Sequence, residues 1–170
     1  MQLIKNGALV TDEWTTLADD AEVPAAGPVI VSLARFKLEQ NSLLARKDKL
    51  GICLKSGEEP AQIADFVDRF SLIALEFPAY RNGRAYSYAY LLRERYGFKG
   101  ELRAVGTVLR DQFNYLTRVG FDTLEVRDNI TPEIFKLSVS TFQNSYQTSA
   151  DGKTPVLSLR QRRIAAQKSS

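Results

Sequence analysis

Arginines and expected helix starts are concentrated between residues 75 and 112, a combination that favours anion binding. The stretch reads LEFPAYRNGRAYSYAYLLRERYGFKGELRAVGTVLRDQ and contains six arginines. Arg81 and Arg84 precede or open one expected helix, and Arg110 lies in the first turn of the next. The first amides of a helix lack partners and its dipole makes this end electropositive. An arginine there destabilises the helix unless an anion or a carboxylate offsets it, so the segment predicts an anion site.

Gly106 and Thr107 stand at the centre of this prediction, because they join an expected strand to an expected helix. Glycine lets a ligand approach the backbone, and threonine either caps the helix or binds an oxyanion. With Arg110 one helical turn on, the turn would hold sulfate, phosphate or a carboxylate. The alternative is a plain turn with a capping threonine and an ion pair between Arg110 and a carboxylate. The predicted anion-binding residues are Arg81, Arg84, Arg103, Gly106, Thr107 and Arg110.

Carboxylates are the candidate acid–base groups, since the chain has no histidine. Glu76 and Asp111 are the two candidates for catalysis. Glu76, Arg103 and Glu125 also interrupt expected strands, where a charge must be paired or must face a cavity. Their pattern predicts either a polar pocket at the strand ends or a structural network of ion pairs.

Absent residue types exclude several classes of function. The chain has no histidine and a single cysteine, Cys53. It therefore lacks the usual ligands of zinc fingers, iron–sulfur clusters and histidine-bound haem, and it cannot carry Ser-His-Asp or Cys-His catalysis. We expect no metal and no cofactor. Cys53 lies inside an apolar strand, which predicts an unreactive buried thiol.

Charge and hydropathy favour neither a membrane nor a nucleic-acid partner. The net charge is +3, and a local basic excess lies in residues 151–170. The start of the chain, MQLIKNGALV, is too short and too polar for a secretion signal, and no apolar run reaches membrane-spanning length. We expect a cytoplasmic protein.

Short apolar runs alternate with segments of helical period, which predicts an α/β fold. The runs begin near residues 28, 50, 71, 101 and 122. Continuous apolar strands that alternate with helices imply a mainly parallel sheet. We expect an N-terminal β-hairpin followed by about five βα units in a partial-barrel arrangement, with a doubly wound open sheet as the alternative. In both arrangements a ligand binds at the C-terminal ends of the strands.

The expected domain spans residues 1–150, and residues 151–170 form a basic tail that we expect to be flexible. Within the domain, the sequence predicts a hairpin over 1–15, a connector over 16–28 and βα units over 29–146. Helical period predicts helices near 60–70, 84–96 and 107–120, the last with Thr107 as its N-cap, and a further helix after Pro132.

The central block of the chain resembles a bacterial family catalogued as domain of unknown function nine-three-four. The segments that carry the resemblance are LIKNGALVTDEW, PVIVSLARF, LGICL, FPAYRNGRAYSYAYLLRERYGFKGELRAVG and LRDQFNYLTRVGFDTLEV, which together cover most of residues 2–146. Members of that family are often labelled oxidoreductases linked to sulfite reduction, and they usually show an acidic residue where this chain has Thr107. The residues here that match the central motif of the family are Phe77, Pro78, Arg81, Gly83, Arg84, Arg93, Arg95, Gly97, Gly100, Arg103, Gly106, Arg110, Asp111 and Gln112.

The resemblance implies a role in sulfur assimilation, and the residues limit what that role is. Sulfite reduction needs sirohaem and an iron–sulfur cluster, for which one cysteine and no histidine provide no adequate ligands. The leading hypothesis is a cytoplasmic accessory protein that binds a small anion, such as sulfite, sulfate or phosphate, or a partner sulfite reductase or related redox protein. The alternatives are a small (βα)-type enzyme, a reductase, lyase or isomerase that uses Glu76 or Asp111, and a structural homodimer or interaction module with a tyrosine-rich helix at its interface.

Overall fold

Eight strands form a single curled sheet in the described part of the chain. The computed structural model describes residues 1–78 and 83–140. The strand order is β2-β1-β8-β7-β6-β5-β4-β3, and all neighbours from β3 to β8 are parallel, whereas β1 is antiparallel to both β2 and β8. The strands are β1 (Gln2–Lys5), β2 (Ala8–Val10), β3 (Thr15–Thr16), β4 (Val29–Ser32), β5 (Leu50–Leu54), β6 (Leu72–Phe77), β7 (Glu101–Gly106) and β8 (Thr123–Val126).

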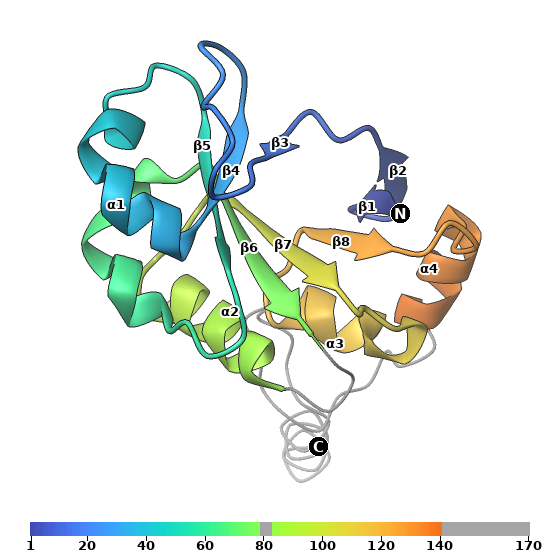
Figure 1. Cartoon of the computed structure of the whole chain (residues 1–170). Helices are drawn as coiled ribbons and strands as arrows, with labels where there is room; N and C mark the ends of the chain where they lie inside the picture. Colours follow the sequence, from blue (N-terminus) through green and yellow to red (C-terminus); the bar gives the residue numbers. More distant parts are fainter. Residues whose placement is uncertain (79–82, 141–170) are drawn as a thin grey trace, which may run out of the picture.

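The helices cover the convex face of this sheet (Figure 1). Strands β4 to β8 follow one another in the sheet in chain order. Because parallel crossovers are right-handed, an unbroken order places every crossover on the same face. The predicted partial barrel is therefore confirmed, and the doubly wound alternative, which needs a reversal of strand order, is wrong. The helices are α1 (Leu33–Leu44), η1 (Pro60–Arg69), α2 (Arg84–Glu94), η2 (Arg110–Gln112), α3 (Phe113–Arg118) and α4 (Pro132–Ser140).

Alternation along the strands divides the apolar residues between the two faces. In β6, Ile73 and Leu75 belong to the main core under the helices, whereas Leu72 and Ala74 belong to a smaller cluster on the concave face. Successive side chains of a strand point to opposite faces, so the sequence of each strand supplies both layers. Trp14 also packs on the concave cluster, close to the Cα of Gly51, where a β-carbon would lie 3.1 Å from the indole ring.

The N-terminal hairpin forms as the sequence predicts. Asn6 and Gly7 connect β1 to β2 with φ angles of 51° and 80°, the left-handed region that two-residue hairpin turns require. The chain then crosses the open side of the sheet, because β2 lies at one edge and β3 at the other (Figure 1). Residues 11–14 make this crossing. They carry no strand partner, so their side chains are available to line the concave face.

Two local predictions were wrong. The predicted connector starts at residue 16, but Thr15 and Thr16 pair with β4 as a short strand. The helix predicted over 107–120 starts only at Arg110, as a single 3-10 turn followed by α3. Thr107 does not cap it, because the N-cap position is Leu109. The Thr107 amide donates to the carbonyl of Phe77 (2.7 Å) and keeps this turn beside β6.

The helix predicted near 60–70 is present as a 3-10 helix, and those expected around 84–96 and after Pro132 are present as α2 and α4. In the part of the chain that the structure describes, none of the helices combines the length and apolar character needed to cross a membrane. The predicted anion ligand Arg81 and the predicted tail over 151–170 lie outside the described residues.

Candidate functional site

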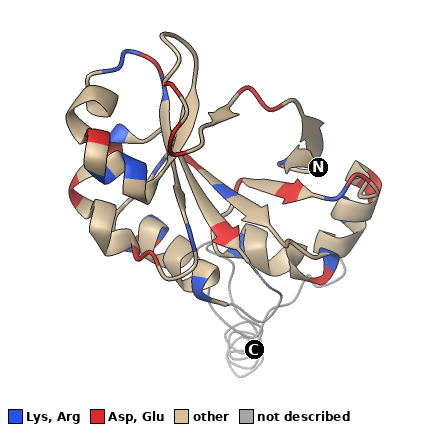
Figure 2. Ribbon diagram, viewed as in Figure 1, with Lys and Arg blue, Asp and Glu red and all other residues tan. Residues whose placement is uncertain are grey.

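A cavity of about 330 Å³ lies on the concave face, towards the C-terminal ends of the parallel strands. Ligands of parallel α/β sheets bind at this end, because the strands stop there and the following loops diverge. Figure 2 shows charged residues on β6, β7 and β8, which interrupt strands that are otherwise uncharged in this region. The cavity is lined by Leu3, Asp12, Thr16, Ile30, Cys53, Ala74, Glu76, Arg103, Val105, Gly106 and Glu125.

The strand register places Glu76 and Glu125 in one row across the cavity. Glu76 on β6 pairs with Val105 on β7. Arg103 pairs with Thr123 on β8, and continuing this register puts Val105 beside Glu125. The two glutamates are thus two strands apart on the same face, with roughly 10 Å between their Cα atoms. Their side chains point into the same space from opposite sides of β7.

Arg103 is buried below this row and is fully occupied by carboxylates. Its Nη1 donates to both Asp12 carboxylate oxygens (2.9 and 3.0 Å), and its Nε and Nη2 donate to Glu101 Oε1 (3.2 and 3.1 Å). Glu101 also accepts a hydrogen bond from Lys5 (2.5 Å). This network ties the crossing segment 11–14 to the middle of the sheet and neutralises the guanidinium.

The pKa of Glu101 reports the balance of this network. Burial alone would raise the pKa of its carboxyl, but the hydrogen bond from Lys5 and the charge and hydrogen bond of Arg103 together lower it below the ordinary value. The charged form of Glu101 is therefore favoured in the folded protein. The network is a structural element of the site, as the ion-pair alternative of the sequence analysis expected.

Glu125 and Glu76 differ in how they are held. Glu125 Oε2 accepts the backbone N–H of Gly106 (3.2 Å). Gly106 has a φ of 89°, and a β-carbon there would lie 2.8 Å from the carbonyl oxygen of Phe77. Within residues 1–78 and 83–140, by contrast, no hydrogen bond or ion pair reaches the half-buried Glu76 carboxylate. Glu125 is fixed by its neighbour, and Glu76 is left facing the cavity.

Cys53 forms part of the cavity wall and is half-buried rather than enclosed in the core. The sequence predicted an unreactive buried thiol, and the structure leaves this thiol partly exposed because Cys53 lies on the concave face of β5, beside Ala74. Burial, together with the negative charges of Glu76 and Glu58, raises the pKa of the thiol to about 11. The thiol is therefore protonated near neutral pH, so it is a weak nucleophile and a hydrogen-bond donor.

The family of the chain follows from its sequence. A model of a family described as bacterial protein of unknown function (DUF934) matches residues 51–157, more than half of the 170 residues. The chain belongs to this family. No curated protein and no solved structure matches it significantly.

The DUF934 match runs from β5 through α4 and beyond. It includes the glutamates of the cavity row, Cys53 and Arg103. Asp12 and Thr16 precede it, so the N-terminal part of the cavity wall lies outside the matched region. Sequence reasoning missed Asp12 and Thr16, because nothing local to residues 11–16 shows that this segment crosses to Arg103, 91 positions away.

The other predicted site residues are distributed over different parts of the fold. Glu76, Arg103 and Gly106 meet in the cavity. Arg110 does not line it, and its Nε donates to Ser138 of α4 (2.8 Å). Asp111 is exposed on η2, and Arg84 is exposed at the start of α2. The structure thus brings together one predicted acid–base residue and two predicted anion ligands, of which Arg103 is already paired.

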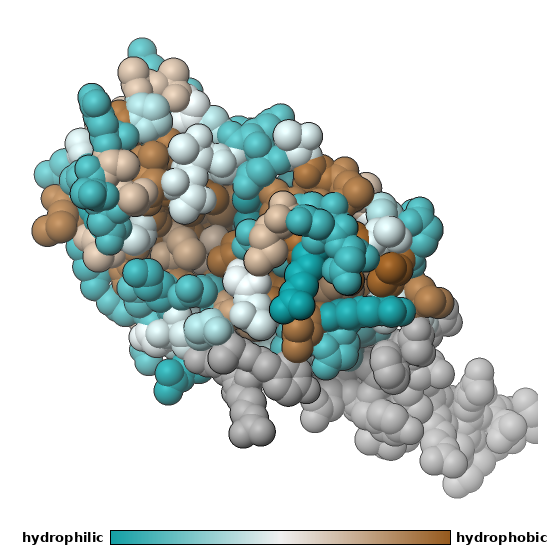
Figure 3. Space-filling view, turned by 45° about the vertical axis from the view of Figure 1, so that its right-hand side comes forward, coloured by the Kyte–Doolittle hydropathy of each residue, from teal (hydrophilic) through white to brown (hydrophobic). Residues whose placement is uncertain are grey.

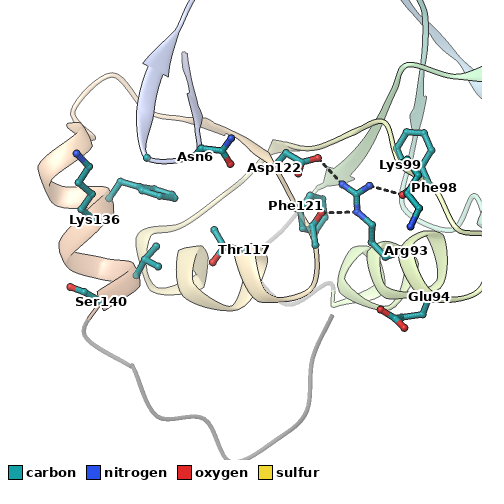
Figure 4. A pocket seen from close by; sticks show the side chains of 14 residues that line it. Asn6, Arg93, Glu94, Phe98, Lys99, Thr117, Phe121, Asp122, Lys136 and Ser140 are labelled. Atoms are coloured by element: carbon teal, nitrogen blue, oxygen red, sulfur yellow. Dashed lines mark hydrogen bonds and ion pairs between the residues drawn. The ribbon is translucent and has the colours of Figure 1, made fainter. Parts of the chain in front are cut away.

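A second and larger hollow of about 1040 Å³ lies at the opposite, N-terminal ends of the strands (Figure 4). Arg93 at its inner side donates to the carbonyl oxygens of Gly120, Phe98 and Gly100 and to Asp122. These contacts use the guanidinium to hold the loops before β7 and β8.

From the side shown in Figure 3, hydrophilic side chains surround recessed apolar surface. No cluster of metal-ligating side chains occurs among the described residues.

Proposed function

We propose that this DUF934 protein acts on a small molecule by carboxylate acid–base chemistry in the concave cavity, with Glu76 as the group that accepts and returns a proton. One observation carries the proposal. Glu76 lies on the central strand β6, at the ligand-binding end of a parallel sheet, and no hydrogen bond or ion pair from the described residues reaches its carboxylate.

A half-buried carboxylate that has no protein partner keeps its hydrogen-bonding capacity for a ligand, and such a group in a cavity at the strand ends is a candidate for function. The surrounding groups suit a proton transfer. Glu125 is fixed by the Gly106 amide, and the Cys53 thiol is a donor beside Glu76. The cavity volume lies at the lower end of the range for ligand pockets. In an isomerisation the proton leaves one substrate atom and returns to another, so no co-reactant is needed; a lyase step would begin with the same proton removal.

Glu76→Gln tests this proposal. The parent protein is incubated with a bacterial small-molecule extract in deuterated water, and compounds that gain deuterium are identified by mass spectrometry. Replacing a general base slows proton exchange by about 10²–10⁴-fold, so we expect the labelling to disappear in Glu76→Gln. The matched control is Glu59→Gln, an exposed glutamate outside the cavity. Equal labelling by the parent and by Glu76→Gln would exclude Glu76 as the acid–base group.

The second proposal is a cytoplasmic accessory role in assimilatory sulfite reduction, through binding of a partner reductase or a small anion. Its support is the resemblance stated above, together with the ligand count: one cysteine and no histidine leave the sirohaem and the cluster to a partner. Within the described residues, the cavity offers an anion no unpaired cation, since Arg103 is neutralised. An anion site in this protein is therefore expected outside the cavity, and Arg110, which lies on the exposed surface beside Ser138, is the predicted ligand to test.

A thermal-shift measurement with sulfate, sulfite and phosphate tests the anion part of this second proposal. We expect each anion to stabilise the parent protein, and we expect this stabilisation to be smaller in Arg110→Ala. The reason is that a cation in the first turn of a helix is disfavoured by about 0.3–1 kcal/mol unless an anion lies nearby. Arg95→Ala, at the C-terminal end of α2, is the control. Equal shifts in the parent and Arg110→Ala proteins would remove Arg110 from the site.

A further inference from the structure

The charges around the concave cavity are unbalanced. Three carboxylates, those of Asp12, Glu76 and Glu125, line it against one guanidinium, that of Arg103, so the lining carries a net charge of −2. Glu101, which lies just outside the lining, takes two further donors of Arg103 and is itself paired with Lys5. The excess negative charge therefore lies in the row formed by Glu76 and Glu125.

The guanidinium and the backbone amide that would bind an anion in this cavity already have carboxylate partners. All three nitrogens of the Arg103 guanidinium donate to Asp12 or Glu101. The amide of Gly106 donates to Glu125. An incoming anion would have to displace a carboxylate of the protein itself and would approach two further negative charges. The cavity thus disfavours an anion and favours a ligand that supplies hydrogen-bond donors and positive charge.

The shape of the lining divides into a polar row and an apolar floor. Glu76 and Glu125 flank Val105, and their spacing of roughly 10 Å between Cα atoms leaves room for a donor group between the carboxylates. An alkylammonium group has three N–H donors in a compact volume, which matches two facing carboxylates. Ile30, Ala74 and Val105 form the apolar floor, and Leu3, Thr16 and Cys53 complete the lining beside the paired Arg103 and Asp12.

We propose that the ligand of the concave cavity is a small organic amine in its ammonium form, with its charge between Glu76 and Glu125 and its apolar part on the floor formed by Ile30, Ala74 and Val105. This inference rests on the site of the first proposed function and names its substrate class. Burial is the main cause of the raised pKa of the Cys53 thiol, and the negative charges of Glu76, Glu58 and Glu125 raise it further.

Three probes of equal length separate the charge of the ligand from its apolar part: n-butylammonium, n-butanol and butyrate. Binding to the full chain is measured by titration with detection of protein NMR shifts. We expect n-butylammonium to bind at least about tenfold more tightly than n-butanol, because one hydrogen bond between charged groups contributes that much to the affinity. We expect butyrate to bind most weakly of the three. Glu76→Gln and Glu125→Gln should each weaken n-butylammonium binding about tenfold, whereas the exposed control Glu59→Gln should leave it unchanged.

Equal affinity for n-butylammonium and n-butanol, tighter binding of butyrate, or no saturable binding of n-butylammonium would each overturn the proposal. So would unchanged affinity in both glutamine variants, after circular dichroism has shown that they fold. Failure here is distinct from failure of the acid–base proposal. Suppose that a compound gains deuterium with the parent protein but not with Glu76→Gln, and that this compound is neutral or anionic. The acid–base role of Glu76 then stands, and the ammonium ligand is excluded.

Discussion

Replacing Arg93 by alanine should lower the free energy of unfolding by about 3 kcal/mol, the largest effect that we expect of a single substitution outside the core. Arg93 Nε donates to Gly120 O (3.0 Å), its Nη1 donates to Phe98 O (2.7 Å) and Gly100 O (3.0 Å), and its Nη2 donates to Asp122 Oδ2 (2.6 Å). One side chain on α2 thus holds the segments that lead into β7 and β8 (Figure 4).

The loss in Arg93→Ala comes mainly from the three carbonyl oxygens. Each was paired with a charged donor and would be left unsatisfied or hydrated in a confined space, at about 1–3 kcal/mol for a buried group. Asp122 contributes less, because its side chain is 38% exposed and water screens the ion pair. Gly120 fits the same arrangement: a β-carbon there would lie 2.7 Å from Arg93 Cγ.

Thermal unfolding measures this effect, and for a chain of this size 3 kcal/mol corresponds to a decrease in Tm of roughly 10 °C. Arg95→Ala is the matched control, since Arg95 is exposed two residues further on, and its guanidinium only faces the Tyr96 ring at 5.9 Å. We expect the control to stay within about 0.5 kcal/mol of the parent. A similar Tm for Arg93→Ala and Arg95→Ala would show that the carbonyl groups find other partners.

The architecture was predictable because it depends on local patterns that recur along the chain. Apolar runs separated by segments of helical period predict parallel strands, and Asn6-Gly7 predicts the hairpin. Strand order was not predictable in the same way. The choice between a partial barrel and a doubly wound sheet depends on which strands pair, and both orders satisfy the same period.

The site was only partly predictable, because its charges are paired over long distances in sequence. The interruption of strands by Glu76, Arg103 and Glu125 predicts either a polar pocket or a network of ion pairs, and in the structure these residues line one cavity in which Arg103 is ion-paired. The sequence does not show which of these charges is neutralised. The sequence predicts Arg103 as an anion ligand, but in the structure Asp12 of the N-terminal segment pairs with it. Glu76 and Glu125 differ because only Glu125 accepts a hydrogen bond from the Gly106 amide.

Thr107 shows a second limit of sequence reasoning. A threonine between a strand and an amphipathic segment matches the pattern of an N-cap. The hydrogen bond from its amide to Phe77 O instead continues the contact between β7 and β6, and the helix begins three residues later. This strand contact is favoured over a helix start at Thr107, because the Phe77 carbonyl at the end of β6 would otherwise lack this donor.

Replacing Arg103 by methionine should lower the free energy of unfolding by about 2 kcal/mol and release the crossing segment 11–14 from the sheet. The Arg103 side chain is 5% exposed, and its loss leaves Glu101, 14% exposed, with Lys5 as its remaining partner. Asp12 is 41% exposed and regains water, so Asp12→Asn alone should cost less than about 1 kcal/mol.

Urea unfolding measures the stability change in Arg103→Met, and amide hydrogen exchange at Trp14 and Leu17 measures the release of the segment. We expect both amides to exchange faster in Arg103→Met, because Asp12 is the contact that holds residues 11–14 to the middle of the sheet. The matched control is Arg127→Met, an exposed arginine just after β8. Unaltered exchange at Trp14 in Arg103→Met would contradict this prediction. It would mean that the packing of Trp14 on Gly51 and the pairing of β3 with β4 hold the segment without the ion pair, so that the cavity wall does not depend on Arg103.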